Sequence, residues 1–190
     1  MIRRLALISA LAFAFGFTVA SLKGQGGGLL DGVGNLSAPW LLVAFLPGLQ
    51  SRSVVKGAMI GLAATMLALA GFYLAVTLGA HYYGLHGLRA GLGLAVSANR
   101  RYFEAGLLSG PVCGAFGSWW SSRGSYRAVP VAGALLLAEP AVILAISAVH
   151  ALSRYAGGWS ADPGIYVAEF LAGAVVLIAA RLLPRRGSAA

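Results

Sequence analysis

The amino-acid sequence predicts an all-α polytopic membrane protein, a single-domain bundle of about six transmembrane helices with both termini in the cytoplasm. Of its 190 residues, 59% are hydrophobic and only 10% are charged, whereas roughly 25% are charged in an ordinary soluble domain. A soluble core of this size could not hide so much apolar surface, because surface area shrinks too slowly with chain length. Most of the 27 glycines lie inside apolar runs, where transmembrane helices use glycine for close packing.

The predicted spans are apolar runs bounded by charged or polar residues. They cover residues 5–22, 29–49, 57–78, 105–120, 129–151 and 165–183. The first run follows Arg3 and Arg4, an arrangement that is also typical of a secretory signal peptide, here with a cleavage site after Ala20. The run is long enough to cross a bilayer and the rest of the chain is rich in spans, so we expect it to be retained.

The second run and the connector after the third run are less regular than the others. Ala38–Leu49 is shorter than the roughly 20 residues that a spanning helix needs. Two interpretations remain open: a short helix begins at Pro39 with Ser37 as its N-cap, or a full helix begins at Leu29 and carries a polar outer end. The glycine-rich middle of the connector, Leu85–Ala98, is too short to span and is expected at the interface or as a re-entrant segment.

The distribution of basic residues sets the predicted orientation. Cytoplasmic segments of membrane proteins are enriched in Lys and Arg. With the N-terminus inside, the inner segments hold Arg3, Arg4, Arg52, Lys56, Arg123, Arg127, Arg181, Arg185 and Arg186. The outer segments then hold Lys23, Arg89, Arg100, Arg101 and Arg154. The larger inner set favours cytoplasmic termini, although Arg100 and Arg101 do not fit the rule.

Glu139 is the leading candidate for a functional residue. A charged side chain at the centre of a bilayer costs at least about 2.5–3.5 kcal/mol on insertion scales. Glu139 lies about 16 Å along its predicted helix from Ala128, near the bilayer midplane. It precedes Pro140, which disfavours helical geometry at Glu139 and frees a carbonyl one turn back. Two interpretations remain open: a ligand or proton site, or a protonated side chain that is hydrogen-bonded to a neighbouring helix.

Other polar residues are predicted to gather in the outer half of the bundle. Asp31, Glu104 and Glu169 lie near the ends of spans that begin outside, and His150 follows Glu139 by three helical turns on the same face. These positions predict an outward-facing polar cavity that reaches down to Glu139. The alternative is that each residue is interfacial and solvated, with Arg100 and Glu104 as an i,i+4 pair. The candidates for a solute, ion or proton site are Glu139, Glu169, Asp31, Asn35, Glu104 and His150.

Small residues at four-residue spacing predict faces for helix packing or for a partner. These are Ala6, Ala10 and Ala14 in the first run and Gly106, Gly110 and Gly114 in the fourth. Such faces let helix backbones approach closely. Internal packing is the default interpretation, and the face of the first run could instead contact another membrane protein.

Several function classes are disfavoured by the sequence. The net charge of +9 is spread between apolar runs, without the basic stripe or stacking aromatics of a nucleic-acid-binding surface. A single cysteine, Cys113, excludes an internal disulfide and a cysteine-cluster metal site. The sequence contains no phosphate-binding loop, zinc-protease motif or nucleophile elbow. We therefore expect a non-enzymatic protein with no cofactor, no metal and no nucleic-acid partner.

Several motifs together resemble a family of small bacterial membrane proteins of unknown function. They are Asn35 with Pro39–Phe45, Gly71–Phe72–Tyr73, Gly110–Pro111 through Gly114 to Gly117, Trp119–Trp120, and Glu139. This resemblance implies a multi-pass protein of the bacterial cytoplasmic membrane and brings no activity with it. The architecture is also distantly similar to the substrate-binding subunits of energy-coupling-factor vitamin transporters. Those six-helix proteins bind a solute in the outer half and contact a coupling partner through small residues on the first helix, which Ala6, Ala10 and Ala14 resemble.

Three functions remain open at this stage. The favoured one is small-solute or ion binding and transport through the outward-facing cavity that ends at Glu139. The alternative is a non-catalytic assembly or interaction subunit, whose small-residue faces bind other membrane protein subunits in the lipid bilayer. An intramembrane enzyme acting on lipid comes last, because no nucleophile or metal constellation supports it.

Overall fold

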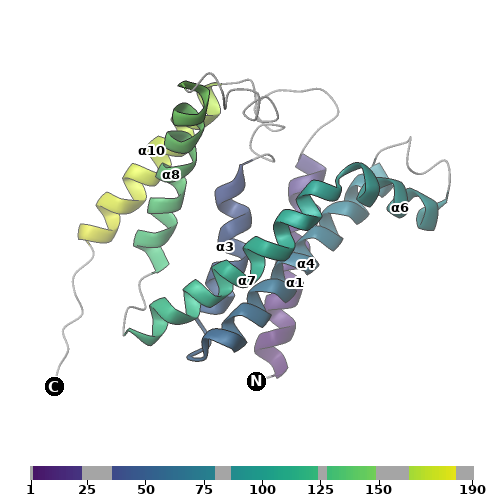
Figure 1. Ribbon diagram of the computed structural model, residues 1–190, viewed down its shortest axis with the longest axis horizontal. Coiled ribbons are helices and arrows are strands. Elements are labelled where there is room, and N and C mark those ends of the chain that lie inside the picture. The colour runs from purple at the N-terminus through teal and green to yellow at the C-terminus, as the bar shows by residue number, and fades with distance from the viewer. Residues whose placement is uncertain (1, 23–35, 80–86, 124–127, 149–162, 183–190) are drawn as a thin grey trace. The chain divides into compact units, whose positions relative to one another are not determined.

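A computed structural model describes residues 2–22, 36–79, 87–123, 128–148 and 163–182, and every regular element in them is an α-helix (Figure 1). The helices are α1 (Ile2–Leu22), α3 (Ser37–Gly48), α4 (Val54–Gly79), α6 (Leu88–Ala98), α7 (Arg100–Ser122), α8 (Ala128–Ala148) and α10 (Pro163–Leu182). The predicted all-α class is confirmed. The chain forms two compact units, Met1–Tyr126 (unit 1) and Arg127–Ala190 (unit 2). A single domain would need the two units to pack together, and it stays a prediction.

Three of the described helices are long and apolar enough to cross a membrane. They are Arg3–Leu22 in α1, Val54–Gly79 in α4 and Gly164–Leu182 in α10. Shorter apolar helical stretches cover Ser37–Gly48, Leu88–Ala98 and Val129–Ala145. Each run that the sequence marks as a span contains a helix. Six crossings with cytoplasmic termini stay a prediction.

The starts of α3 and α7 differ most from the predicted ones. Helix α3 begins at Ser37, between the two predicted starts, with Leu36 in extended geometry at its N-cap and no side-chain cap. The start at Pro39 with Ser37 as N-cap is wrong, and so is one continuous helix from Leu29, because Leu36 is not helical. Pro39 is tolerated inside the first turn because the N–H groups there have no partner within the helix. Helix α7 begins at Arg100, five residues before the predicted span.

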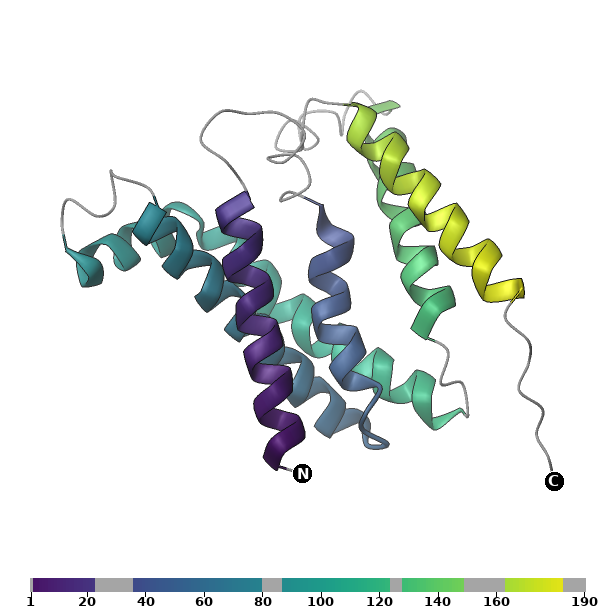
Figure 2. The same ribbon diagram turned by 180° about the vertical axis from the view of Figure 1, so that it is seen from behind.

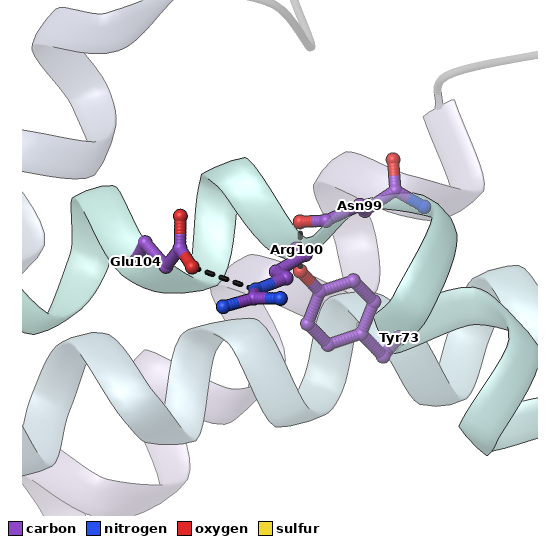
Figure 3. A network of polar contacts seen from close by, with 4 residues as sticks. All are labelled: Tyr73, Asn99, Arg100 and Glu104. Atoms are coloured by element: carbon purple, nitrogen blue, oxygen red, sulfur yellow. Dashed lines mark hydrogen bonds and ion pairs between the residues drawn. The ribbon is translucent and has the colours of Figure 1, made fainter.

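The middle of the predicted connector is the short helix α6, which packs on α4. Gly91 and Ala95 are its buried residues, and Ala95 belongs to a core cluster with Leu69 and Tyr73 of α4. The Tyr73 hydroxyl also donates a hydrogen bond of 3.1 Å to the carbonyl oxygen of Asn99, between α6 and α7 (Figure 3). This bond ties the start of α7 to α4.

Close contact between α4 and α7 depends on glycine. A methyl group on Gly61 would lie 2.7 Å from the Cα atom of Gly114, whereas nonbonded carbon atoms prefer about 3.5–4.0 Å. On α1, Gly16 lies similarly close to the Ala68 backbone of α4. Helix α4 therefore packs against α1 and α7 through small residues, as membrane helices do (Figures 1 and 2).

Aromatic side chains join α1, α3 and α4. The Trp40 ring makes an edge contact with Phe15 at 5.3 Å between ring centroids and another with Phe72 at 5.7 Å. Edge-to-face pairs of this kind contribute roughly 0.5–1.5 kcal/mol beyond the area they bury. Trp40 is thus the aromatic link between three helices of unit 1.

Ser118 makes the buried polar contact that holds α7 to the turn after α3. Its side chain is fully buried, and its hydroxyl donates a hydrogen bond of 2.9 Å to the Ser51 carbonyl oxygen. We expect Ser118→Ala to lower the free energy of unfolding by about 1–2 kcal/mol, because the buried acceptor loses its donor. Titration with SDS in mixed micelles measures this. The control is Ser122→Ala, which removes an exposed hydroxyl bonded within its own helix; an equal loss in both variants would contradict the assignment.

Unit 2 contains the antiparallel pair α8 and α10, which lie side by side in both views (Figures 1 and 2). Gly133 and Gly173 face each other at the contact. A methyl group on Gly133 would lie 2.8 Å from Leu177 Cγ, and one on Gly173 would lie 3.0 Å from the Gly133 carbonyl oxygen. This contact fixes the register of the two helices.

Candidate functional site

The register of α8 and α10 brings Glu139 and Glu169 to the same level. A methyl group on Gly173 would lie 3.0 Å from both Leu136 Cβ and Leu137 Cγ. Glu139 follows Leu136 by three residues on α8, and Glu169 precedes Gly173 by four residues on α10. Because the helices are antiparallel, both steps lead one turn in the same direction and stay on the facing sides. The two glutamates therefore meet across the helix pair.

The Glu169 side chain is deeply buried and has no hydrogen-bond donor among the described residues. It is only 4% exposed, and neither of its carboxyl oxygens has a hydrogen-bond partner there. Its neighbour across the helix pair is the half-buried Glu139, and the two carboxylates repel each other when both are ionised. Two ionised carboxylates cannot hydrogen-bond to each other, because neither carries a hydrogen. The contact becomes a hydrogen bond when one of the two is protonated.

The surroundings of this carboxyl pair are apolar. Within the described part of α8, Glu139 is the only residue with a charged or titratable side chain, and α10 adds only Tyr166 and Arg181 to Glu169. Arg181 follows Glu169 by twelve residues, which is about 18 Å along a helix. No described cation of unit 2 is therefore close enough on these helices to neutralise the pair.

Pro140 does not break α8. The sequence predicted disturbed helical geometry at Glu139, but the helix is continuous from Ala128 to Ala148 and Pro140 is buried within it. Proline is tolerated in apolar helices where neighbouring helices and small adjustments satisfy the backbone. Pro140 still lacks an N–H, so it cannot donate to the Leu136 carbonyl one turn back. The carboxyl pair thus lies on a continuous helix, not beside a break.

The remaining predicted site residues lie in unit 1 or outside the described residues. Glu104 lies in unit 1, where its exposed carboxylate accepts a 2.7 Å bond from the Arg100 guanidinium, one turn earlier on α7 (Figure 3). This is the solvated i,i+4 arrangement, which contributes only a few tenths of a kcal/mol. Asp31, Asn35 and His150 lie outside the described residues. An outward cavity that joins all of these residues therefore stays a prediction.

Unit 1 holds a cavity that sequence reasoning missed. It has a volume of about 230 Å³ and lies between α3, α4 and α7. Its aromatic lining is Trp40, Phe72 and Tyr102, and its hydroxyl groups are those of Ser37, Thr65 and Ser109. The Thr65 hydroxyl is already bonded to the Gly61 carbonyl in its own helix. Three helices contribute the lining, so no local pattern in the sequence could have indicated it.

The predicted small-residue faces have different environments. Gly106, Gly110 and Gly114 are buried on α7. Ala6, Ala10 and Ala14 are exposed on α1. The buried stripe of α1 is formed instead by Ala12, Gly16 and Ala20. An alanine-rich helix offers several such stripes, and the partner helix selects one of them.

The part of the chain that the structure describes contains no cluster of metal-binding side chains. No group of three or more His, Cys, Asp or Glu side chains there could hold a metal ion. Cys113 is a half-buried free thiol on α7. Comparisons of the chain with protein-family models, curated proteins and solved structures find no match. The site is therefore interpreted from its own geometry.

Proposed function

We propose that this chain is a multi-pass membrane protein that binds and moves a small solute or ion, with Glu139 and Glu169 as its binding groups. The proposal includes about six spans with both termini in the cytoplasm, in a bacterial cytoplasmic membrane. The observation that carries it is the buried Glu169 carboxyl beside the half-buried Glu139 in an otherwise apolar helix pair. Ionisable groups inside apolar helices usually mark ion, proton or solute pathways.

The outer face of the helix pair suits lipid as its solvent. On α10, the side chains exposed around and beyond Glu169 are large and apolar: Val167, Phe170, Leu171, Val175 and Ile178. A stripe of this kind would be unfavourable in water, where large exposed apolar patches lead to association. In a bilayer the same stripe has no unfavourable free energy of solvation, because lipid surrounds it. The two carboxyls are then the groups whose transfer from water is unfavourable.

The cost of the carboxyl pair argues against a purely structural role. Each charged acid costs roughly 2.5–3.5 kcal/mol at the centre of a membrane helix on insertion scales. Apolar residues of similar volume at these positions would be equally stable or more stable, because buried charges seldom recover their desolvation cost. A role in binding explains why two acids lie at one level.

A second candidate function, an assembly or interaction subunit, is favoured by one observation. The Ala6, Ala10 and Ala14 stripe is exposed on α1, and small-residue stripes allow close helix contact in membranes. This arrangement also suits a solute-binding subunit that works with a membrane partner. The two functions predict different co-purifying molecules, a small solute for the transport protein and a protein partner for the assembly subunit.

The test is purification of the tagged protein from its native membrane, followed by mass spectrometry of bound small molecules and co-purifying proteins. We expect a bound solute in the wild type and at least a tenfold lower amount in Glu139→Gln, because the carboxyl that contacts it is lost. Glu104→Gln, which changes an exposed carboxylate outside the proposed site, should retain the solute. Full retention by Glu139→Gln would overturn the role of the pair. A specific protein partner without any solute would favour the assembly subunit.

A further inference from the structure

Resting on the proposed function, we infer that the pair takes a monovalent cation, and that this cation is a single proton held between the carboxyls of Glu139 and Glu169. Glu169 supplies the buried position, since its side chain is only 4% exposed and its oxygens have no hydrogen-bond partner among the described residues. Glu139 is half-buried and supplies the route of exchange. The inference adds a proton to the carboxyls that contact the solute in the proposed function.

One proton satisfies the pair better than none. Two ionised carboxylates side by side repel each other, and each also loses its hydration. With one proton, a carboxylic acid donates an O–H to the neighbouring carboxylate, and only one negative charge remains. With two protons, each acid can donate its O–H to the other, and no negative charge remains. Neighbouring carboxyls in other proteins share one proton, because two like charges in contact cannot both ionise.

The described residues of α8 and α10 place no cationic side chain beside the pair. Tyr166 lies one turn before Glu169 and Arg181 lies beyond three turns after it, both on α10. Helix α8 contributes no such group apart from Glu139 in its described residues. Since the described residues of α8 and α10 supply no cation beside the pair, we assign its balancing positive charge to a bound proton, which needs no further ligands.

A metal cation suits the pair less well than a proton. Calcium takes about 6–8 oxygen ligands, and magnesium demands about six in octahedral geometry. The pair offers four carboxyl oxygens, and on α8 the Leu136 carbonyl lacks its usual donor, because Pro140 has no N–H. The facing leucines and glycines add no side-chain oxygen. Sodium is the metal cation that the labelling experiment tests as a competitor of the proton.

Exchange of the proton is expected to run through Glu139. Binding is a simple proton transfer: a proton from water joins one carboxylate oxygen, and the resulting O–H donates to the other glutamate. Release reverses both changes. The buried Glu169 exchanges with its surroundings only through its neighbour, so the two carboxyls act as one binding site with a buried and an accessible member.

The test is labelling with dicyclohexylcarbodiimide, an apolar reagent that reacts with protonated carboxyls in apolar surroundings. The acid O–H adds across a C=N bond of the reagent, and the adduct rearranges to a stable N-acylurea that mass spectrometry locates. The full-length protein is reconstituted in vesicles of phosphatidylethanolamine and phosphatidylglycerol at neutral pH. We expect about one label per chain, divided between Glu139 and Glu169, and none on the exposed Glu104.

The variants separate a shared proton from two independent acids. In Glu169→Gln, Glu139 no longer faces a second carboxyl, and its labelling at neutral pH should fall at least about tenfold. Glu104→Gln should leave the labelling unchanged. Absence of label in the wild type, two labels per chain, unchanged labelling of Glu139 in Glu169→Gln, or protection of both residues by sodium chloride but not choline chloride would overturn the inference. Sodium protection would still leave the proposed ion-binding function intact. A third outcome is that the labelling is as expected but the purification from native membranes yields no bound solute. This outcome would support the proton site and overturn the binding of a solute.

Discussion

Substitution of Gly114 by alanine is expected to destabilise unit 1 by about 3 kcal/mol, at the upper end of the usual cost of overpacking. The added methyl group would lie 2.8 Å from Gly61 Cα and 2.9 Å from the Gly61 nitrogen. Both are backbone atoms of α4, so no side chain can rotate away to make room. The helices must move apart, and other contacts between α4 and α7 weaken with them. SDS titration in mixed micelles gives the change in the free energy of unfolding.

A matched glycine serves as the control for this substitution. Gly93 lies in the interior of α6, and a methyl group there would have no neighbour within 4 Å. We expect Gly93→Ala to stabilise the protein by about 0.5–1 kcal/mol, because alanine has less backbone freedom to lose and a higher helix propensity. Similar stabilities for Gly114→Ala and the wild type would contradict the close contact between α4 and α7.

Composition and hydropathy were sufficient to predict the helical class and the approximate position of every described helix except α6. They sum over many residues, so local errors average out. The starts of α3 and α7 depend on single residues. Pro39 fits inside the first turn of α3, and the Arg100–Glu104 pair lies within the first turns of α7. The first turns of α3 and α7 are too polar or too irregular for a hydropathy pattern to assign them to a helix.

The sequence indicated both members of the candidate site but not their contact. Glu139 and Glu169 are acids inside apolar runs, and that composition alone makes them conspicuous. Their meeting depends on the register of α8 against α10, which the Gly133–Gly173 contact fixes. Periodicity within one helix carries no information about the register between two. Periodicity likewise could not show that the stripe of Ala6, Ala10 and Ala14 is exposed, because this depends on α4 packing on a different stripe of α1.

A second large effect, efficient disulfide cross-linking between α8 and α10, is expected when cysteines replace the two glutamates. In a Cys113→Ala background, Glu139→Cys and Glu169→Cys replace facing side chains at one level of α8 and α10. Mild oxidation in native membranes should therefore cross-link most molecules, because a disulfide requires Cα atoms within about 7 Å and side chains that point toward each other. Ala138 is the matched control position, since it precedes Glu139 in α8 but is exposed.

The central claim is that Glu139 and Glu169 face each other as one site, and the rate of this cross-link tests it most directly. After oxidation, the chain is cleaved at a protease site introduced between residues 149 and 162, so only cross-linked molecules keep α8 and α10 together on a non-reducing gel. We expect Glu139→Cys with Glu169→Cys to cross-link at least about tenfold faster than Ala138→Cys with Glu169→Cys. Equal rates for the two pairs, or no cross-link between positions 139 and 169, would contradict it.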